Sequence, residues 1–196
     1  MATSRTKGRN APAGAPAGDE DPAERLRGLL QGLPPVAAPD AERLVLGSMP
    51  GTESLRLRQY YAHPRNHFWP IAGELFGASP ALPYDERLDA LRGAKVAVWD
   101  VLGACRRPGS LDSAIDPDSV RVNDFAGFFA AHPHVRLVAF NGAYAEAMFR
   151  TRVQLGPTPP PAHVDLVRLP STSPANASVP YVEKLARWAA ALGGRR

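Results

Sequence analysis

The chain has 196 residues, of which 44% are hydrophobic. This length suits one globular domain with a well-buried core and is too short for two ordinary domains. The formal net charge is +4, but five basic residues lie within the first ten and the last two positions, which leaves 18 basic against 19 acidic residues elsewhere; the charge is therefore poor evidence that the core binds nucleic acid.

Cys105 is the single cysteine of the sequence. It excludes an intrachain disulfide framework and multi-cysteine zinc or iron–sulfur sites, so other side chains must carry the chemistry. The sequence has no apolar run of bilayer length, and its N-terminus lacks the apolar stretch of a signal peptide. We therefore expect a cytoplasmic protein that is not inserted in a membrane.

The first 22 residues are polar and rich in glycine, alanine and proline. They cannot bury enough apolar surface to offset the loss of chain entropy, so we expect a disordered tail over 1–22 and a single domain over 23–194. Asp21 and Pro22 suit a helix start, and the leucine spacing that follows predicts a first helix reaching about Gln31.

Short apolar runs alternate with amphipathic stretches in the remainder of the chain. The apolar runs predict four strands, at residues 43–46, 95–101, 135–140 and 164–169. The amphipathic stretches predict helices at residues 68–76, 85–91, 123–131, 143–150 and 181–192. Alternating strands and helices predict an α/β fold with a parallel sheet covered on both faces. Ligands of such sheets bind at the carboxyl ends of the strands, so the loops after Leu46, Val101, Phe140 and Leu169 are the places to search.

The loop after the first of these strands has the highest density of polar, aromatic and basic residues in the chain. It begins Gly47-Ser-Met-Pro-Gly51 and continues through Gln59-Tyr-Tyr-Ala-His-Pro-Arg-Asn-His-Phe-Trp69. Glycines allow close approach of the backbone to a ligand, and aromatic rings with a flat amide can stack on and hydrogen-bond a planar base.

A second polar loop, Leu169-Pro-Ser-Thr-Ser-Pro-Ala-Asn176, follows the last strand. Its hydroxyls and backbone N–H groups could point toward a phosphate. The alternative is an ordinary cap and turn before the last helix.

Together these two loops resemble the motifs of the uracil-DNA glycosylase superfamily. The first loop is most similar to the hypoxanthine-DNA glycosylase branch, and further agreement in order and spacing comes from residues 99–102, 109–115, 140–142 and 170–176. The resemblance covers about residues 40–192. It implies a three-layer α/β/α sandwich with a central four-stranded parallel sheet, no metal and no cofactor. It also implies hydrolysis of the N-glycosidic bond of deaminated bases in DNA, after the nucleotide is turned out of the helix.

The resemblance also assigns the catalytic residues. Where the best-known uracil enzymes carry an aspartate in the first motif, this loop offers Ser48 and Met49, neither of which is a convincing general base. In the branch that the chain resembles, the asparagine of the Pro-Arg-Asn segment is catalytic, and that position is Asn66. An amide can orient water or hydrogen-bond the base, although Asn66 could instead stabilise a turn after Arg65. We take Asn66 and Ser48 as the catalytic candidates.

The remaining candidates contact the base or the DNA backbone. The base-binding candidates are Met49, Tyr60, Tyr61, His63, Phe68 and Asn141. We expect at least two of the three listed tyrosine and phenylalanine rings to belong to the core instead. The DNA-binding candidates are Arg65, Ser171, Ser173 and Asn176. Asp100, at the end of a strand, could act as a base or cap backbone groups.

Two other functions remain open from the sequence. The same fold could prefer uracil, including uracil opposite guanine, because pocket shape decides the base. The lack of an aspartate in the first motif would also suit a catalytically silent DNA-binding module. A monomer is the default, since one lesion occupies one pocket.

Overall fold

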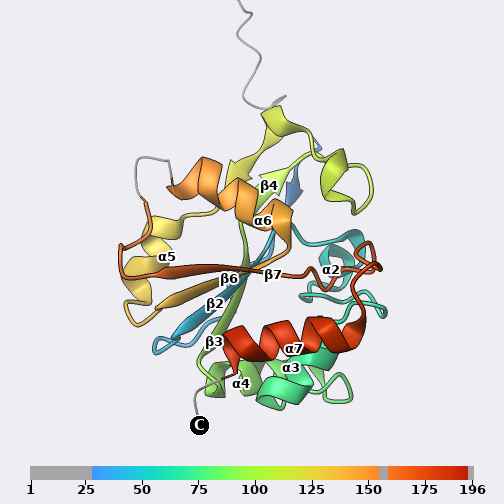
Figure 1. Cartoon of the computed structure of the whole chain (residues 1–196). Helices are drawn as coiled ribbons and strands as arrows, with labels where there is room; N and C mark the ends of the chain where they lie inside the picture. The colour runs from blue at the N-terminus through green and yellow to red at the C-terminus, as the bar shows by residue number, and fades with distance from the viewer. Residues whose placement is uncertain (1–27, 155–158, 194–196) are drawn as a thin grey trace, which may run out of the picture.

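A central sheet of four parallel strands organises the computed structural model, which describes residues 28–154 and 159–193 (Figure 1). The strands lie in the order β3–β2–β6–β7, with bounds β2 Arg43–Gly47, β3 Val96–Asp100, β6 Leu137–Asn141 and β7 Asp165–Leu169. All four predicted strands are present, within two residues of their expected bounds. The predicted α/β fold with a parallel sheet is confirmed.

The strand register sets the position of the site. Leu46 pairs with Trp99 on one side and with Phe140 on the other. The same register places Gly47 beside Asp100 at the carboxyl ends of β2 and β3. The carboxyl ends of all four strands therefore meet at one edge of the sheet, as expected for parallel strands.

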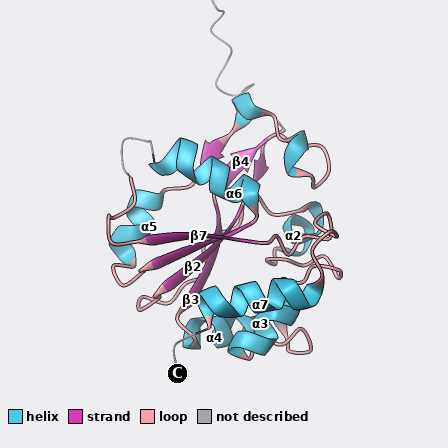
Figure 2. Cartoon of the chain, viewed as in Figure 1, coloured by secondary structure: helices cyan, strands magenta, loops and turns pink. Residues whose placement is uncertain are grey.

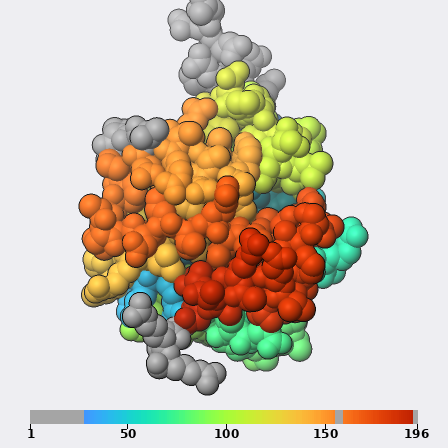
Figure 3. Space-filling model, viewed as in Figure 1, coloured from blue at the N-terminus to red at the C-terminus, as the bar shows by residue number. Residues whose placement is uncertain are grey.

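Helices cover both faces of the sheet, which makes three layers (Figures 1 and 2). One face is covered by α3 Phe68–Phe76, α4 Tyr84–Gly93 and α7 Tyr181–Leu192. The other face is covered by α5 Phe125–Ala131 and α6 Ala143–Met148, which continues as a π-helix over Phe149–Gln154. In the space-filling view, the red C-terminal segment packs directly over the green segment of α3 and α4 (Figure 3).

Aromatic side chains join these layers. Trp99 of β3 lies 5.1 Å from Phe125 and 5.2 Å from Phe128 of α5, measured between ring centroids. On the other face, the ring of Phe68 in α3 meets that of Trp188 in α7 edge-on at 6.0 Å. Burying rings of this size supplies a large share of the hydrophobic stabilisation of a domain.

The predicted helices at residues 68–76 and 181–192 have the expected bounds, and the other three differ by a few residues. The structure adds a short helix, α2 Thr52–Leu57, in the loop after β2. It also adds a small antiparallel sheet and two single turns of 3-10 helix: β1 Leu30–Gln31, β4 Leu102–Cys105, β5 Arg121–Val122, η1 Asp112–Ala114 and η2 Pro117–Ser119.

The predicted first helix is wrong over its last residues. Leu30 and Gln31 form an antiparallel strand with Cys105 and Ala104 of β4. Glycines on either side favour the strand: Gly28 has a φ of 75°, and Gly32 lies so close to β4 that an added Cβ would be 3.0 Å from the Leu102 carbonyl oxygen. Only glycine fits there without displacement of the backbone. The start of that predicted helix and the predicted disordered tail lie outside the described residues.

No helix in the described ranges is both long and apolar enough to cross a membrane.

Candidate active site

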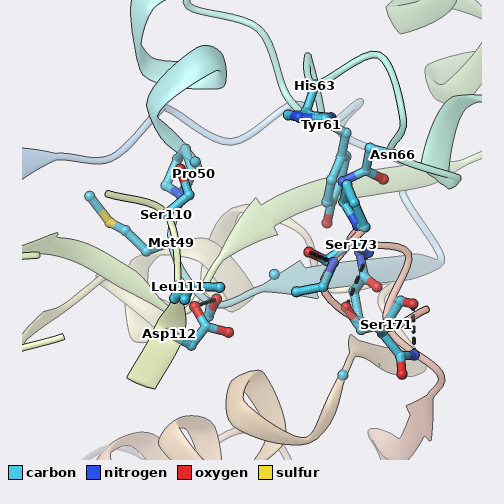
Figure 4. A pocket seen from close by; sticks show the side chains of 18 of the residues that line it. Met49, Pro50, Tyr61, His63, Asn66, Ser110, Leu111, Asp112, Ser171 and Ser173 are labelled. Atoms are coloured by element: carbon cyan, nitrogen blue, oxygen red, sulfur yellow. Dashed lines mark hydrogen bonds between the residues drawn. The ribbon is translucent and has the colours of Figure 1, made fainter. Parts of the chain in front are cut away.

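A cavity of about 740 Å³ opens at the edge where the parallel strands end (Figure 4). Its wall is built from the loop after β2, the segment around Tyr61 to Asn66, the ends of β3 and β6, residues 110–113, and the loop after β7. Most of the residues predicted for the site therefore meet in one place. The volume suits a ligand of nucleoside size.

The loop after β2 is held in place by a buried arginine. The side chain of Arg107 is completely buried, and its guanidinium donates to the carbonyl oxygens of Pro50 at 2.5 Å, Met49 at 3.4 Å and Gly109 at 3.1 Å. A guanidinium keeps its charge and presents donors in a fixed plane, so it can fix several carbonyls at once. Arg107 therefore clamps the first motif against residues 107–112.

Two polar side chains on the two clamped segments meet at the cavity wall. Ser48 donates its hydroxyl to Oδ1 of Asp112 at 2.6 Å, and the Arg107 guanidinium lies 3.9 Å from the same oxygen. Burial raises the pKa of Asp112, while the hydrogen bond from Ser48 and the charge of Arg107 oppose that rise.

Asp100 forms the floor of the cavity. Its side chain is buried, and Oδ1 lies so close to Gly47 that a Cβ added to this glycine would overlap it. This contact explains why the first motif begins with glycine. Burial raises the pKa of Asp100 to about 8, with a further contribution from the nearby Asp112 carboxylate. Oδ2 has no hydrogen-bond partner among residues 28–154 and 159–193.

Of the three predicted aromatic residues, Tyr61 presents its ring to the cavity. It has a left-handed φ of 53°, and its ring stacks on Phe68 with centroids 4.0 Å apart. A non-glycine residue with positive φ stores strain that surrounding contacts must hold, which is common at functional sites. Phe68 lies in the core behind Tyr61 and outside the cavity wall.

Tyr60 reaches the cavity wall but is held by the core. Its hydroxyl lies 3.1 Å from the carbonyl oxygens of Leu33 and Pro34, and its own carbonyl accepts from the Trp69 indole at 2.9 Å. These contacts tie the hydroxyl and the backbone of Tyr60 to the core beside Tyr61.

The Asn66 side chain lies on the cavity wall near Tyr61 and His63 (Figure 4). Its Oδ1 accepts from the backbone N–H of Phe68 at 2.9 Å at the start of α3. Its backbone N–H donates to the His63 carbonyl at 2.8 Å. The amide oxygen is thus oriented by the backbone, and the amide NH₂ is a donor that Asn66 can offer to a ligand.

Asn141 ties the end of β6 to the loop after β7. Its Nδ2 donates to the Thr172 hydroxyl at 2.8 Å, and its Oδ1 accepts from the Thr172 backbone N–H at 2.8 Å. Thr172 is completely buried. Asn141 lines the cavity, but these two bonds use part of its capacity to contact a base.

The loop after β7, residues 170–176, brings the predicted DNA-binding serines to the opposite wall. The hydroxyl oxygen of Ser171 accepts from the Ser173 N–H, and that of Ser173 accepts from the Ala175 N–H, each at 3.2 Å. Neither hydroxyl donates to another group in the part of the chain that the structure describes, so both protons can be offered to a ligand. Asn176 donates from Nδ2 to the Ser171 carbonyl at 3.0 Å, and buried Lys184 of α7 donates to the Asn176 carbonyl at 2.8 Å.

Arg65 does not line this cavity. It lies on a neighbouring hollow of about 280 Å³ together with Ser173, Asn176 and Lys184. In the described part of the chain, no group of three His, Cys, Asp or Glu side chains is arranged to hold a metal ion.

The sequence reasoning assigned no role to Asp112, Arg107, Thr172 or Lys184. The sequence could have indicated Asp112, because this residue lies in the stretch 109–115 that resembles the hypoxanthine branch. The other three hold the loops by bonds to backbone carbonyls or to Asn141, which no local pattern reveals.

Comparison with known proteins places this geometry in a family. No model of a known protein family matches the chain. A protein of Methanosarcina barkeri named hypoxanthine DNA glycosylase is 41% identical over 113 residues, which are 57% of this chain and 70% of the relative. A protein of the same name from Methanosarcina acetivorans is 39% identical over 118 residues, 60% of this chain and 73% of the relative.

A solved structure of a related protein is also similar to this chain. The solution structure of a candidate uracil DNA glycosylase from Methanosarcina acetivorans superposes with a TM-score of 0.67 at 32% identity, covering 84% of this chain and 96% of that one. The three-layer fold, with its cavity at the strand ends, thus defines a DNA glycosylase of the uracil-DNA glycosylase superfamily. Its substrate is DNA. Within that superfamily, the chain belongs to the hypoxanthine DNA glycosylase family.

Proposed function

We propose that the protein removes hypoxanthine from deoxyinosine in DNA as a monofunctional glycosylase. The observation that supports this proposal is the cavity: the Asn66 side chain and the Tyr61 ring both lie on its wall, where a flipped purine could bind. An NH₂ donor suits the negative charge that develops on a base as its bond to the sugar breaks. The relatives named hypoxanthine DNA glycosylase support the same choice of base.

In this proposal, Asn66 is the main catalytic side chain. Its Oδ1 already accepts from the Phe68 N–H, and its NH₂ group would donate a hydrogen bond to the departing base. Tyr61 would stack on the base, with Met49, His63 and Asn141 at its edges, while Tyr60 and Phe68 support the stack from behind. Ser48 takes part through its hydrogen bond to Asp112.

The DNA backbone would lie along the loop after β7. The free hydroxyl protons of Ser171 and Ser173 suit phosphate oxygens, and Asn176 keeps that loop in shape. Arg65, exposed on the neighbouring hollow, would add an electrostatic contact that weakens with salt. Since each cavity accepts one lesion, we infer that the protein acts as a monomer, which light scattering with and without DNA would test. We also infer a cytoplasmic location.

The test is single-turnover excision with the full chain in excess over DNA. Matched duplexes would carry deoxyinosine, deoxyuridine opposite guanine, or an undamaged base at one position, and alkali would cut the abasic product. We expect the fastest cleavage at deoxyinosine and none at the undamaged base.

Uracil is the second candidate, favoured by the solved relative described as a candidate uracil DNA glycosylase. Faster cleavage at deoxyuridine than at deoxyinosine would replace hypoxanthine by uracil. Binding to the damaged duplexes without cleavage of any of them would favour a catalytically silent module.

A further inference from the structure

The loop after β2 contains no ionisable side chain between Gly47 and Gly51. The cavity nevertheless has a carboxylate at this loop, because Asp112 reaches it from the first turn of η1. Its Oδ1 lies 2.6 Å from the hydroxyl of Ser48. The structure thus brings a carboxylate from a separate segment to the motif that lacks one.

Asp112 is accessible as well as held. Its side chain is 37% exposed, whereas Asp100 is buried, so water from the cavity can reach Asp112 more readily. Only Oδ1 is engaged by Ser48 and faces Arg107, so Oδ2 is free to accept a hydrogen bond from water within the described part of the chain. A carboxylate that is oriented through one oxygen and open at the other has the arrangement needed for a general base.

The position of Asp112 relative to Asn66 suits hydrolysis. In the close-up, Asp112 lies with Met49 and Leu111 on one side of the cavity, and Asn66 lies with Tyr61 and His63 on the other (Figure 4). In a direct, inverting displacement at a sugar carbon, water attacks from the face opposite the departing group. If Asn66 holds the base, the attacking water belongs on the side of Asp112.

We propose that Asp112, oriented by Ser48 and Arg107, is the catalytic base that activates the attacking water, an inference that rests on the proposed glycosylase function. The water oxygen bonds to C1′ of the sugar as the C1′–N bond breaks, and the bonding pair leaves with the base. Asp112 takes one proton from the water. That proton then passes through solvent to the departed base, so the products are a free neutral base and an abasic sugar.

Several titratable groups face Asp112. Arg107 follows β4 and stabilises its ionised form, while the Asp100 carboxyl of β3 disfavours a second negative charge. Cys105 of β4 and Tyr144 of α6 also interact with its charge. Burial raises the pKa of Asp100 to about 8, so Asp100 is neutral below that pH and Asp112 can be ionised beside it. When the environment makes the pKa values of two neighbouring carboxyl groups differ, one group commonly acts as an acid and the other as a base.

The test compares single-turnover excision by the wild type and Asp112→Asn over a range of pH, with the base that the wild type removes fastest. Asparagine keeps an oxygen that can accept from Ser48, and Arg107 keeps its three backbone carbonyls, so the fold should survive. We expect a loss of about 100-fold or more. The wild-type rate should fall as acid protonates Asp112, and Asp112→Asn should lack this fall. Ionisation of Asp100 would act on the alkaline side of both profiles, and it would begin at lower pH in Asp112→Asn, because the negative charge of Asp112 no longer opposes it.

Asp89→Asn is the matched control, because Asp89 is a 74% exposed aspartate on α4, away from the cavity wall. It should retain the wild-type rate. Asp112→Glu, which restores a carboxylate on a longer side chain, should recover part of the rate and the fall in acid.

An Asp112→Asn protein within about threefold of the wild type would overturn the role of Asp112. A slower variant with the wild-type dependence on pH would also overturn it, because that result describes a residue that only positions the loop. A wild type that excises no base would overturn the proposed function and this inference together, whereas an active wild type with an equally active Asp112→Asn would overturn this inference alone.

Discussion

The two ends of the Asn66 amide face different parts of the molecule. The oxygen accepts the N–H of Phe68 as α3 begins, and the nitrogen lies toward the cavity. The sequence left two roles open for this residue, in catalysis or in a turn. The structure shows that the turn contact is made by one end of the side chain, so both roles are compatible.

Asn66→Asp separates these two roles. Aspartate keeps an oxygen for the Phe68 N–H, and its charge suits the start of a helix, so we expect thermal stability close to that of the wild type. It has no NH₂ donor and would repel an anionic base, so single-turnover excision should fall by about 100-fold or more.

Asn66→Ala is the companion variant. It lacks both the oxygen and the NH₂ group of the amide. Its rate of excision should therefore fall about as far as that of Asn66→Asp, and its free energy of unfolding should also fall by about 1 kcal/mol. Wild-type excision by Asn66→Asp would contradict the assignment, since it would show that an acceptor at this position is sufficient.

At the scale of elements, the loop after β7 is fixed from three sides. Thr172 is bound by the Asn141 side chain, and its carbonyl accepts from the His67 N–H at 3.0 Å. Lys184 binds the Asn176 carbonyl at 2.8 Å. A loop held in this way presents its serines with little entropy left to lose on binding DNA.

Thr172→Val tests this preorganisation. The variant keeps the shape of the side chain but leaves Nδ2 of Asn141 without its acceptor in a partly buried site, so the free energy of unfolding should fall by about 1 kcal/mol. DNA affinity measured by fluorescence anisotropy should also weaken, because the serines are less well placed.

Thr151→Val is the control for this variant. The hydroxyl of Thr151, at an exposed position of the π-helix, donates to the Ala147 carbonyl at 2.7 Å. Its removal should leave DNA affinity unchanged. Equal DNA affinity of Thr172→Val and the wild type would show that the loop does not depend on this bond.

The elements that the sequence predicted well are those with strong local patterns. α3 and α7 have a clear apolar face, and β2 and β6 are nearly continuous apolar runs. The small antiparallel sheet has strands of two to four residues, and its pairing depends on contacts between distant positions such as Leu30 and Cys105. No local period can reveal such a sheet.

In the candidate site, too, the sequence indicated the residues that lie in local motifs and missed the contacts between distant positions. Gly47, Asn66 and Ser173 lie in motifs whose spacing resembles a family, so the sequence indicated them. The bond between Ser48 and Asp112 joins residues 64 positions apart, and the clamp of Arg107 on Pro50 joins residues 57 apart. These contacts exist only once the strand ends have been brought together by the sheet.

At the scale of the whole molecule, the buried Asp100 links folding to pH. Burial raises its pKa from 3.8 to about 8 in the folded protein. The folded state therefore holds a proton that the unfolded chain releases over this window. The contribution of Asp100 to stability is fully present below the unfolded pKa and is lost as pH rises toward about 8.

Asp100→Asn should remove this dependence. The unfolding free energy of the wild type, relative to the variant, should be larger at about pH 5 than at about pH 9, as measured by urea denaturation. A relative stability that is constant over this range would show that Asp100 is ionised in the folded protein at neutral pH.

The clamp formed by Arg107 binds backbone carbonyls of two loops, so it does not depend on which side chains the first loop carries at Met49 and Pro50. One loop carries Ser48, and the other carries Asp112. Because Asp112 supplies the acid from the second loop, the first loop does not need an acidic residue. The residues of the first loop that would touch the base can therefore differ without loss of that acid. In such a design, the residues that select the damaged base and the acid that activates water stand on separate segments of the chain.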